Sequence, residues 1–135
     1  SFLPQYTGFK NLKLLAGLTG GISDEDIKTA LDRVGLDPED KRPDRKYSLG
    51  MKQKLGIANA IMGEPDIIIL DEPINALDEE SVKKIKKVLL EIRDKDKLII
   101  LACHDMEELE YLSDIIYEIK DGAVIDKKVI ADDNT

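Results

Sequence analysis

The amino-acid sequence predicts an α/β protein in which helices come first and a layer of parallel strands follows. Amphipathic helical spacing dominates before Pro65, and continuous apolar runs bounded by charged residues dominate after it. Those runs alternate with further helical stretches, and strands joined by crossover helices are typical of parallel sheets. We therefore expect residues 1–64 to form a helical part and residues 65–135 to form a strand-containing part.

Three helices are predicted in the first part, the first from a Leu-rich segment and the other two from their start and stop signals. Ser23, with Asp26 three residues later, has the pattern of a capping box, and Ser48 can cap another helix. Glycines follow the second and third apolar stretches and mark helix ends. The charged stretch 37–44 is interpreted as a solvated linker. The predicted helices cover residues 11–18, 23–34 and 48–62.

Short apolar runs predict the strands of the second part, and their continuous composition predicts burial on both faces of the sheet. Asp78 can cap the helix between the first two strands, whose apolar stripe faces a core. The pair Asp121 and Gly122 is a favoured two-residue hairpin turn. The predicted strands cover residues 67–70, 98–103, 115–119 and 123–125, and a short helix covers residues 106–112.

Composition excludes several classes of protein. The 135 residues suit one domain-sized core, and 20 Lys and Arg against 28 Asp and Glu give a net charge of −8. The sequence has no basic stretch interleaved with aromatic residues, so nucleic acid is not an expected partner. Its longest apolar runs are too short to span a membrane. The single cysteine, Cys103, lies in an apolar run and is expected in the core, which fits a cytoplasmic protein.

Polar residues at the carboxyl ends of the strands are the first candidates for chemistry, because ligands bind there in open parallel sheets. Asp71 and Glu72 follow the first apolar run, and His104 follows the second. One carboxylate suits hydrated Mg²⁺, a second can deprotonate a water, and an imidazole can donate to a phosphate oxygen. The alternative is that the strands simply end in charged turn residues.

The start of the third predicted helix is a candidate phosphate site. Ser48 offers a hydroxyl there, and Leu49 and Gly50 offer backbone N–H groups at the positive end of the helix dipole. The alternative is that Ser48 only caps its own helix, which is the commoner role of a serine at this position.

Four short segments stand out by their order and spacing. They are Tyr-Ser-Leu-Gly-Met-Lys-Gln at residues 47–53, Ile-Ile-Ile-Leu-Asp-Glu-Pro at 67–73, Asn-Ala-Leu-Asp at 75–78, and His104. In this order they resemble the signature motif, the Walker B motif, the D-loop and the switch histidine of ATP-binding cassette (ABC) ATPases. The resemblance covers nearly the whole chain. It implies an α/β fold that is part of a RecA-like P-loop NTPase, preceded by the ABC helical subdomain.

The resemblance also implies roles for the candidate catalytic residues. It implies that Asp71 holds Mg²⁺ through water and that Glu72 is the general base for the attacking water. His104 would contact the γ-phosphate of ATP. The implied cofactors are therefore ATP and Mg²⁺.

Other residues would act on a second cassette, because two cassettes of this family face head to tail. Ser48, Leu49, Gly50 and Met51 would cap the nucleotide held by the partner cassette, and Asp78 would lie in the contact between the two. Leu49 stands where the common motif has its first glycine, and Met51 stands where it has glutamine. This variant resembles exporters that move antibiotics or antimicrobial peptides.

The phosphate-binding loop of such ATPases is missing from the sequence. A P-loop needs Gly-x-x-x-x-Gly-Lys followed by Ser or Thr, and no such stretch occurs in the 135 residues. We expect the chain to be the later part of a longer cassette whose Walker A half lies upstream. The complete cassette is then expected to hydrolyse ATP, and this chain alone is expected to be inactive.

Three functions are compatible with these observations. The first is the ATPase subunit of a transporter, peripheral on the cytoplasmic face of the membrane and bound to a membrane-spanning subunit. The second is an ABC ATPase that acts on ribosomes or DNA, against which the acidic charge counts. The third is a catalytically empty assembly module, which a nucleotide-binding measurement separates from the first. The transported substrate is not encoded here, because selectivity lies in the membrane partner.

Overall fold

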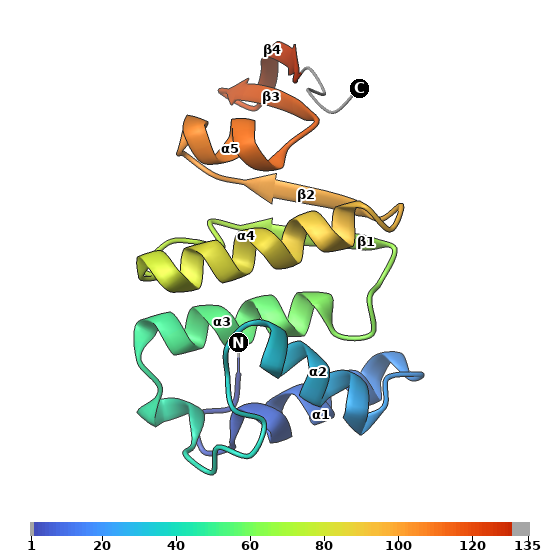
Figure 1. Ribbon diagram of the computed structural model, residues 1–135, viewed down its shortest axis with the longest axis vertical. Coiled ribbons are helices and arrows are strands. Elements are labelled where there is room, and N and C mark those ends of the chain that lie inside the picture. The colour runs from blue at the N-terminus through green and yellow to red at the C-terminus, as the bar shows by residue number, and fades with distance from the viewer. Residues whose placement is uncertain (1, 131–135) are drawn as a thin grey trace. The chain divides into compact units, whose positions relative to one another are not determined.

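The computed structural model describes residues 2–130, and the chain forms two compact units, which divide after Ala102 (Figure 1). No helix in residues 2–130 is both long enough and apolar enough to cross a membrane. The first unit contains α1 (Gly8–Thr19), α2 (Asp24–Arg33), the 3-10 helix η1 (Asp44–Lys46), α3 (Leu49–Ile61), β1 (Ile67–Asp71), α4 (Glu79–Arg93) and β2 (Leu98–Ala102). The second unit contains α5 (Met106–Leu112), β3 (Ile115–Lys120) and β4 (Ala123–Val129).

Side-chain caps explain where the first two helices begin. The Ser23 hydroxyl accepts a hydrogen bond from the Asp26 amide at 3.1 Å, and the Asp26 carboxylate accepts one from the Ser23 amide at 2.9 Å. This closes the predicted capping box of α2. Helix α1 begins three residues earlier than predicted, because Thr7 caps it by accepting from the Lys10 amide at 3.1 Å.

A buried asparagine fixes the chain just before α1. Asn11 is 3% exposed, and its Oδ1 accepts from the Leu3 amide at 2.7 Å. Its side-chain amide donates to the carbonyl oxygens of Leu3, Tyr6 and Thr7 at 3.0 to 3.2 Å. One side chain therefore satisfies several main-chain groups of the N-terminal segment, which a buried polar residue requires.

The stretch 37–44 is not solvated throughout, contrary to the prediction. Asp44 is buried, and its amide donates to the Tyr6 carbonyl at 2.8 Å. The Arg45 amide donates to the Pro4 carbonyl at 3.0 Å. Main-chain hydrogen bonds therefore hold the end of this stretch against the N-terminal segment. The charged composition of the stretch does not indicate this contact.

One apolar core joins the helices of the first unit to β1. Helix α3 contacts β1, and α2 contacts both α3 and α4. The large side chains that are fully buried come from all of these elements. Among them are Ile27, Leu31, Leu55, Ile57, Ile61, Ile68, Ile85 and Ile92.

Strands β1 and β2 pair in parallel, as predicted, and α4 forms the crossover between them. The prediction that the strands are buried on both faces is wrong. Ile68 and Leu70 of β1 are buried, whereas Ile67 and Ile69 on the opposite face are 57% and 68% exposed. The packed face carries alternate residues, because successive side chains of a strand point to opposite faces. An unbroken apolar run does not distinguish one covered face from two.

The second unit is built around a hairpin. Strands β3 and β4 pair antiparallel, and the turn residues Asp121 and Gly122 have φ angles of 50° and 77°. Two positive values are what a type I′ turn requires, which confirms the predicted turn.

Cys103 lies beyond the end of β2 and is partly exposed, so its expected place in a core strand is wrong.

Gly8 leads to a prediction about packing, since it begins α1 where no side chain fits. A Cβ at this position would lie 2.7 Å from the Tyr47 hydroxyl oxygen and 3.2 Å from the Cδ1 of Leu55, and both residues are buried. Gly8→Ala should therefore lower the free energy of unfolding by about 1–3 kcal/mol, the range for overpacking a core. Urea unfolding of the variant and the parent chain measures this change.

Gly17 in the same helix provides the matched control. No described atom lies within 4 Å of the position that its Cβ would take, apart from its chain neighbours and the nearby backbone of its own helix. Gly17→Ala should raise the free energy of unfolding by about 0.5–1 kcal/mol, because alanine favours a helix over glycine. Equal effects of the two alanines would contradict the packing argument.

Candidate functional site

The acidic pair predicted from the sequence lies at the carboxyl end of β1. Asp71 is the last residue of this strand, is exposed, and stands opposite Ala102 at the end of β2. Glu72 follows directly, and its amide donates to the Ala102 carbonyl at 2.7 Å. Both acids therefore stand at the carboxyl edge of a parallel strand pair, which is the edge where such sheets bind ligands.

The backbone of Glu72 has an uncommon conformation. Its φ of 47° lies in the left-handed region, which costs a residue with a side chain roughly 1–3 kcal/mol. The Glu72 carbonyl accepts hydrogen bonds from the Gln53 Nε2 at 2.7 Å and from the Asn75 amide at 3.2 Å. The contact with Gln53 joins residues 19 positions apart, so no local sequence signal indicates it.

The start of α3 lies beside the loop that follows β1 in the same chain. A Cβ on Gly50 would lie 3.3 Å from the carbonyl oxygen of Ala76. Ala76, within the segment that resembles a D-loop, itself has a positive φ of 66°. The structure therefore brings the signature-like segment and the D-loop-like segment together within one chain.

The side chains at the start of α3 differ in what they contact. The Ser48 hydroxyl accepts from the Met51 amide at 3.1 Å, so Ser48 does cap its own helix. Leu49 is 70% exposed, and the Met51 sulfur lies 3.8 Å from the Nη2 of Arg42. The first N–H groups of any helix lack partners within the helix, and capping by Ser48 is compatible with an anion at the same end.

Asp78 caps α4 and is held in its charged form. Its carboxylate accepts from the Ser81 amide at 2.8 Å. Hydrogen bonds from the Ser81 side chain and backbone, helped by the charge of Lys54, hold the pKa of Asp78 below its usual value. This residue therefore fixes the point at which the loop after β1 becomes a helix.

His104 belongs to the second unit, whereas the two acids belong to the first. It is exposed and precedes Asp105, which caps α5 by accepting from the Glu107 amide at 3.0 Å. A joint role of His104 with Asp71 and Glu72 stays a prediction.

The acidic pair also has the donor chemistry for magnesium. Within residues 2–130, no three His, Cys, Asp or Glu side chains gather into a group that could hold a metal ion. Mg²⁺ is usually bound by one or two carboxylates and completes its shell with water and phosphate oxygens. Asp71 beside Glu72 therefore fits an ion that binds together with a nucleotide, not an all-protein metal site.

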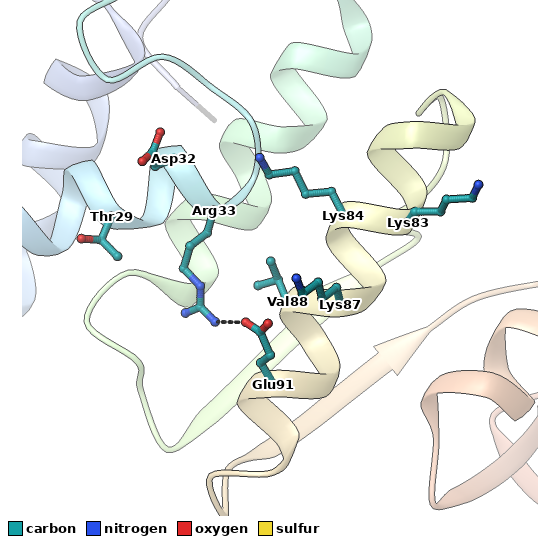
Figure 2. Close-up of a pocket in the computed structure, with 8 residues that line it drawn as sticks. All are labelled: Thr29, Asp32, Arg33, Lys83, Lys84, Lys87, Val88 and Glu91. Atoms are coloured by element: carbon teal, nitrogen blue, oxygen red, sulfur yellow. Dashed lines mark ion pairs between the residues drawn. The ribbon is translucent and has the colours of Figure 1, made fainter.

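A hollow of about 630 Å³ between α2 and α4 has a different lining (Figure 2). Lys83, Lys84 and Lys87 of α4 line it together with Arg33, which pairs with Glu91 at 3.5 Å. This hollow is not lined by any described residue that we predict to act on ATP. The strand edge remains the candidate site.

Comparison with known proteins decides the family. Residues 1–75 match the family described as ABC transporter. The chain belongs to this family. It is 39% identical over 132 residues to the bacitracin transport ATP-binding protein BcrA of Enterococcus faecalis, covering 97% of this chain and 43% of BcrA. It is 35% identical over 122 residues to the lantibiotic transport ATP-binding protein SrtF of Streptococcus pyogenes, covering 90% of this chain and 53% of SrtF.

The chain spans about half the length of the curated relatives it matches. Among solved structures, it is similar to a dimeric post-hydrolysis state of the ATP-binding cassette MJ0796 bound to ADP and Pi, with a TM-score of 0.86 and 23% sequence identity. That match covers 98% of this ABC transporter chain and 60% of the other chain. The likeness confirms the predicted fold class, an α/β ABC cassette of the P-loop NTPase type.

Tyr47 anchors the start of α3 and leads to a prediction about pH. Burial raises the pKa of its hydroxyl above the ordinary value of 10.0, and the Gly8 amide partly opposes this shift. The folded chain therefore holds the phenol proton more tightly than the unfolded chain does. The resulting stability is complete below pH 10 and is lost as the pH rises through the folded pKa.

We expect the free energy of unfolding to fall above pH 10 and to fall less steeply in Tyr47→Phe, which has no proton to lose. Urea unfolding at steps between about pH 8 and about pH 11 measures both slopes. Identical slopes in the two proteins would show that Tyr47 does not contribute.

Proposed function

We propose that this chain is part of the ATP-binding and ATP-hydrolysing subunit of an ABC transporter that exports an antibiotic or antimicrobial peptide. The observation that carries the proposal is the Asp71–Glu72 pair at the carboxyl edge of the parallel strands, with the start of α3 beside the loop that follows it. The named relatives support the transport role, since they are bacitracin and lantibiotic transport ATP-binding proteins.

Within this proposal the chain works with two partners. A membrane-spanning subunit binds it at the cytoplasmic face of the membrane, and the helical part transmits the state of the nucleotide to that subunit. A second cassette faces it head to tail. The dimeric form of the cassette MJ0796 supports the second partner.

The hydrolytic roles follow from the chemistry of three side chains. Asp71 holds Mg²⁺ through water, and the ion neutralises charge on the phosphates when bound. Glu72 accepts the proton of the attacking water as the general base. His104 donates a hydrogen bond to an oxygen of the γ-phosphate.

The start of α3 acts on the nucleotide of the partner cassette. Ser48 contributes its hydroxyl, and Leu49, Gly50 and Met51 contribute the first turn of a helix whose dipole favours a phosphate. Asp78 lies in the contact between the cassettes. The exposure of Ser48, Leu49 and Asp78 supports these roles.

The chain alone should hydrolyse ATP negligibly. Positioning the phosphates supplies most of the catalysis in phosphoryl transfer, and the sequence lacks the glycine-rich loop and lysine that position them. Phosphate release from the purified 135-residue chain checks this. Steady turnover above background that Glu72→Gln abolishes would contradict it.

In a cassette that contains this chain, a Walker A segment and the membrane partner, Glu72→Gln should lower turnover by about two to four orders of magnitude. ATP binding should stay close to that of the parent, because the general base is needed for the chemical step only. His104→Ala should also lower turnover. Glu39→Gln, at an exposed position between α2 and η1, is the matched control and should leave turnover unchanged.

Binding and turnover are measured with nucleotide titration and phosphate release on the same preparations. A parent-like rate in Glu72→Gln or in His104→Ala would remove the role that we assign to that residue.

A further inference from the structure

Gln53 is a polar side chain of α3 to which the hydrolytic mechanism above assigns no role. It lies about one turn after the start of the helix and is partly buried. Its side-chain amide donates to the main-chain carbonyl of Glu72 at 2.7 Å, a short distance for an N–H···O bond. A helix of the N-terminal part therefore holds the residue that we propose as the general base.

Hydrogen bonds from different segments fix the Glu72 peptide. Its amide donates to the carbonyl at the end of β2, and its carbonyl accepts from Asn75 in the following turn and from Gln53 in α3. Of these bonds, the one from Gln53 comes from a side chain, so a substitution can remove it and leave the main chain intact. The left-handed φ of Glu72 makes the conformation dependent on such bonds, because strained backbone persists only where its surroundings fix it.

The same end of α3 touches this loop at a second point. The position that a Cβ of Gly50 would take lies 3.3 Å from the carbonyl of Ala76. That contact meets the far end of the loop after β1, whereas Gln53 meets its beginning. The first turns of α3 therefore hold both ends of the loop that carries Glu72.

We propose that Gln53 is a positioning residue for ATP hydrolysis, which holds the Glu72 backbone, and with it the direction of the Glu72 carboxylate, against α3. The inference rests on the proposed function, in which Glu72 is the general base. A base must lie within hydrogen-bond reach of the proton that it takes, so a small displacement of its backbone costs rate. Helix α3 then serves two sites at once, the nucleotide of the partner cassette and the base of its own chain.

The test replaces Gln53 in the cassette that contains a Walker A segment and the membrane partner. Gln53→Met keeps the length and bulk of the side chain and removes the donor. We expect kcat to fall about 10- to 100-fold and the KM for ATP to stay within about twofold, since the variant changes the chemical step and not binding. Gln53→Glu places a carboxylate against the Glu72 carbonyl and should lower kcat at least as far.

Two further variants complete the series. Gln53→Asn keeps the amide on a shorter arm and should have an intermediate kcat, and it provides the test if Gln53→Met does not fold. Gln5→Met makes the same change at an exposed glutamine in the N-terminal segment and should keep the parent kcat.

Hydrogen exchange supplies a readout that a purely structural role would not give. In Gln53→Met, the amides of Glu72 and Asn75 should exchange faster, while those of α2 keep their rates. Uniformly faster exchange across the first unit, in step with the loss of kcat, would overturn the positioning role.

Glu72→Gln, measured in parallel, separates this inference from the proposed function. A low kcat in Glu72→Gln with a parent-like kcat in Gln53→Met would overturn the role of Gln53 alone. A parent-like kcat in Glu72→Gln would overturn both.

Discussion

The packing of α3 against β1, in a core to which α2 and α4 also contribute buried side chains, is the constraint on which the rest of the first unit depends. Ile68 of the strand and Ile85 and Ile92 of α4 are fully buried there, and α3 contacts the same strand. Burial of each such side chain stabilises the fold by about 1.5–3 kcal/mol, so no element can shift without loss. Because β1 ends in the acidic pair and α3 begins with the signature-like segment, this core sets the distance between two groups of functional residues.

Local signals in the sequence predicted the parts of the fold that depend on neighbouring residues. Three features involve residues close in the chain: the capping box of Ser23, the turn with positive φ values at Asp121 and Gly122, and the acidic pair at the end of β1. Parallel pairing of the first two strands was predictable because a helix long enough for a crossover separates them.

Contacts between distant residues could not be predicted in this way. Asn11 reads as an ordinary helical polar residue, and Asp44 reads as part of a charged linker, yet main-chain packing buries both. Gln53 lies in the signature-like segment, and the sequence of that segment does not indicate which of its side chains contacts the loop after β1. The exposed face of β1 was also missed, because an apolar run records composition and not the number of packed faces.

The antiparallel contact between the N-terminal segment and the residues around η1 has a mechanical consequence. Thr7 bridges to Pro43, and the amides of Asp44 and Arg45 bond to carbonyls of the segment. A pull along this segment loads these bonds in shear, so they must break together and not one after another. Tension on the segment therefore divides between α1, which follows it directly in the chain, and the residues around η1 just before α3, to which these bonds join it.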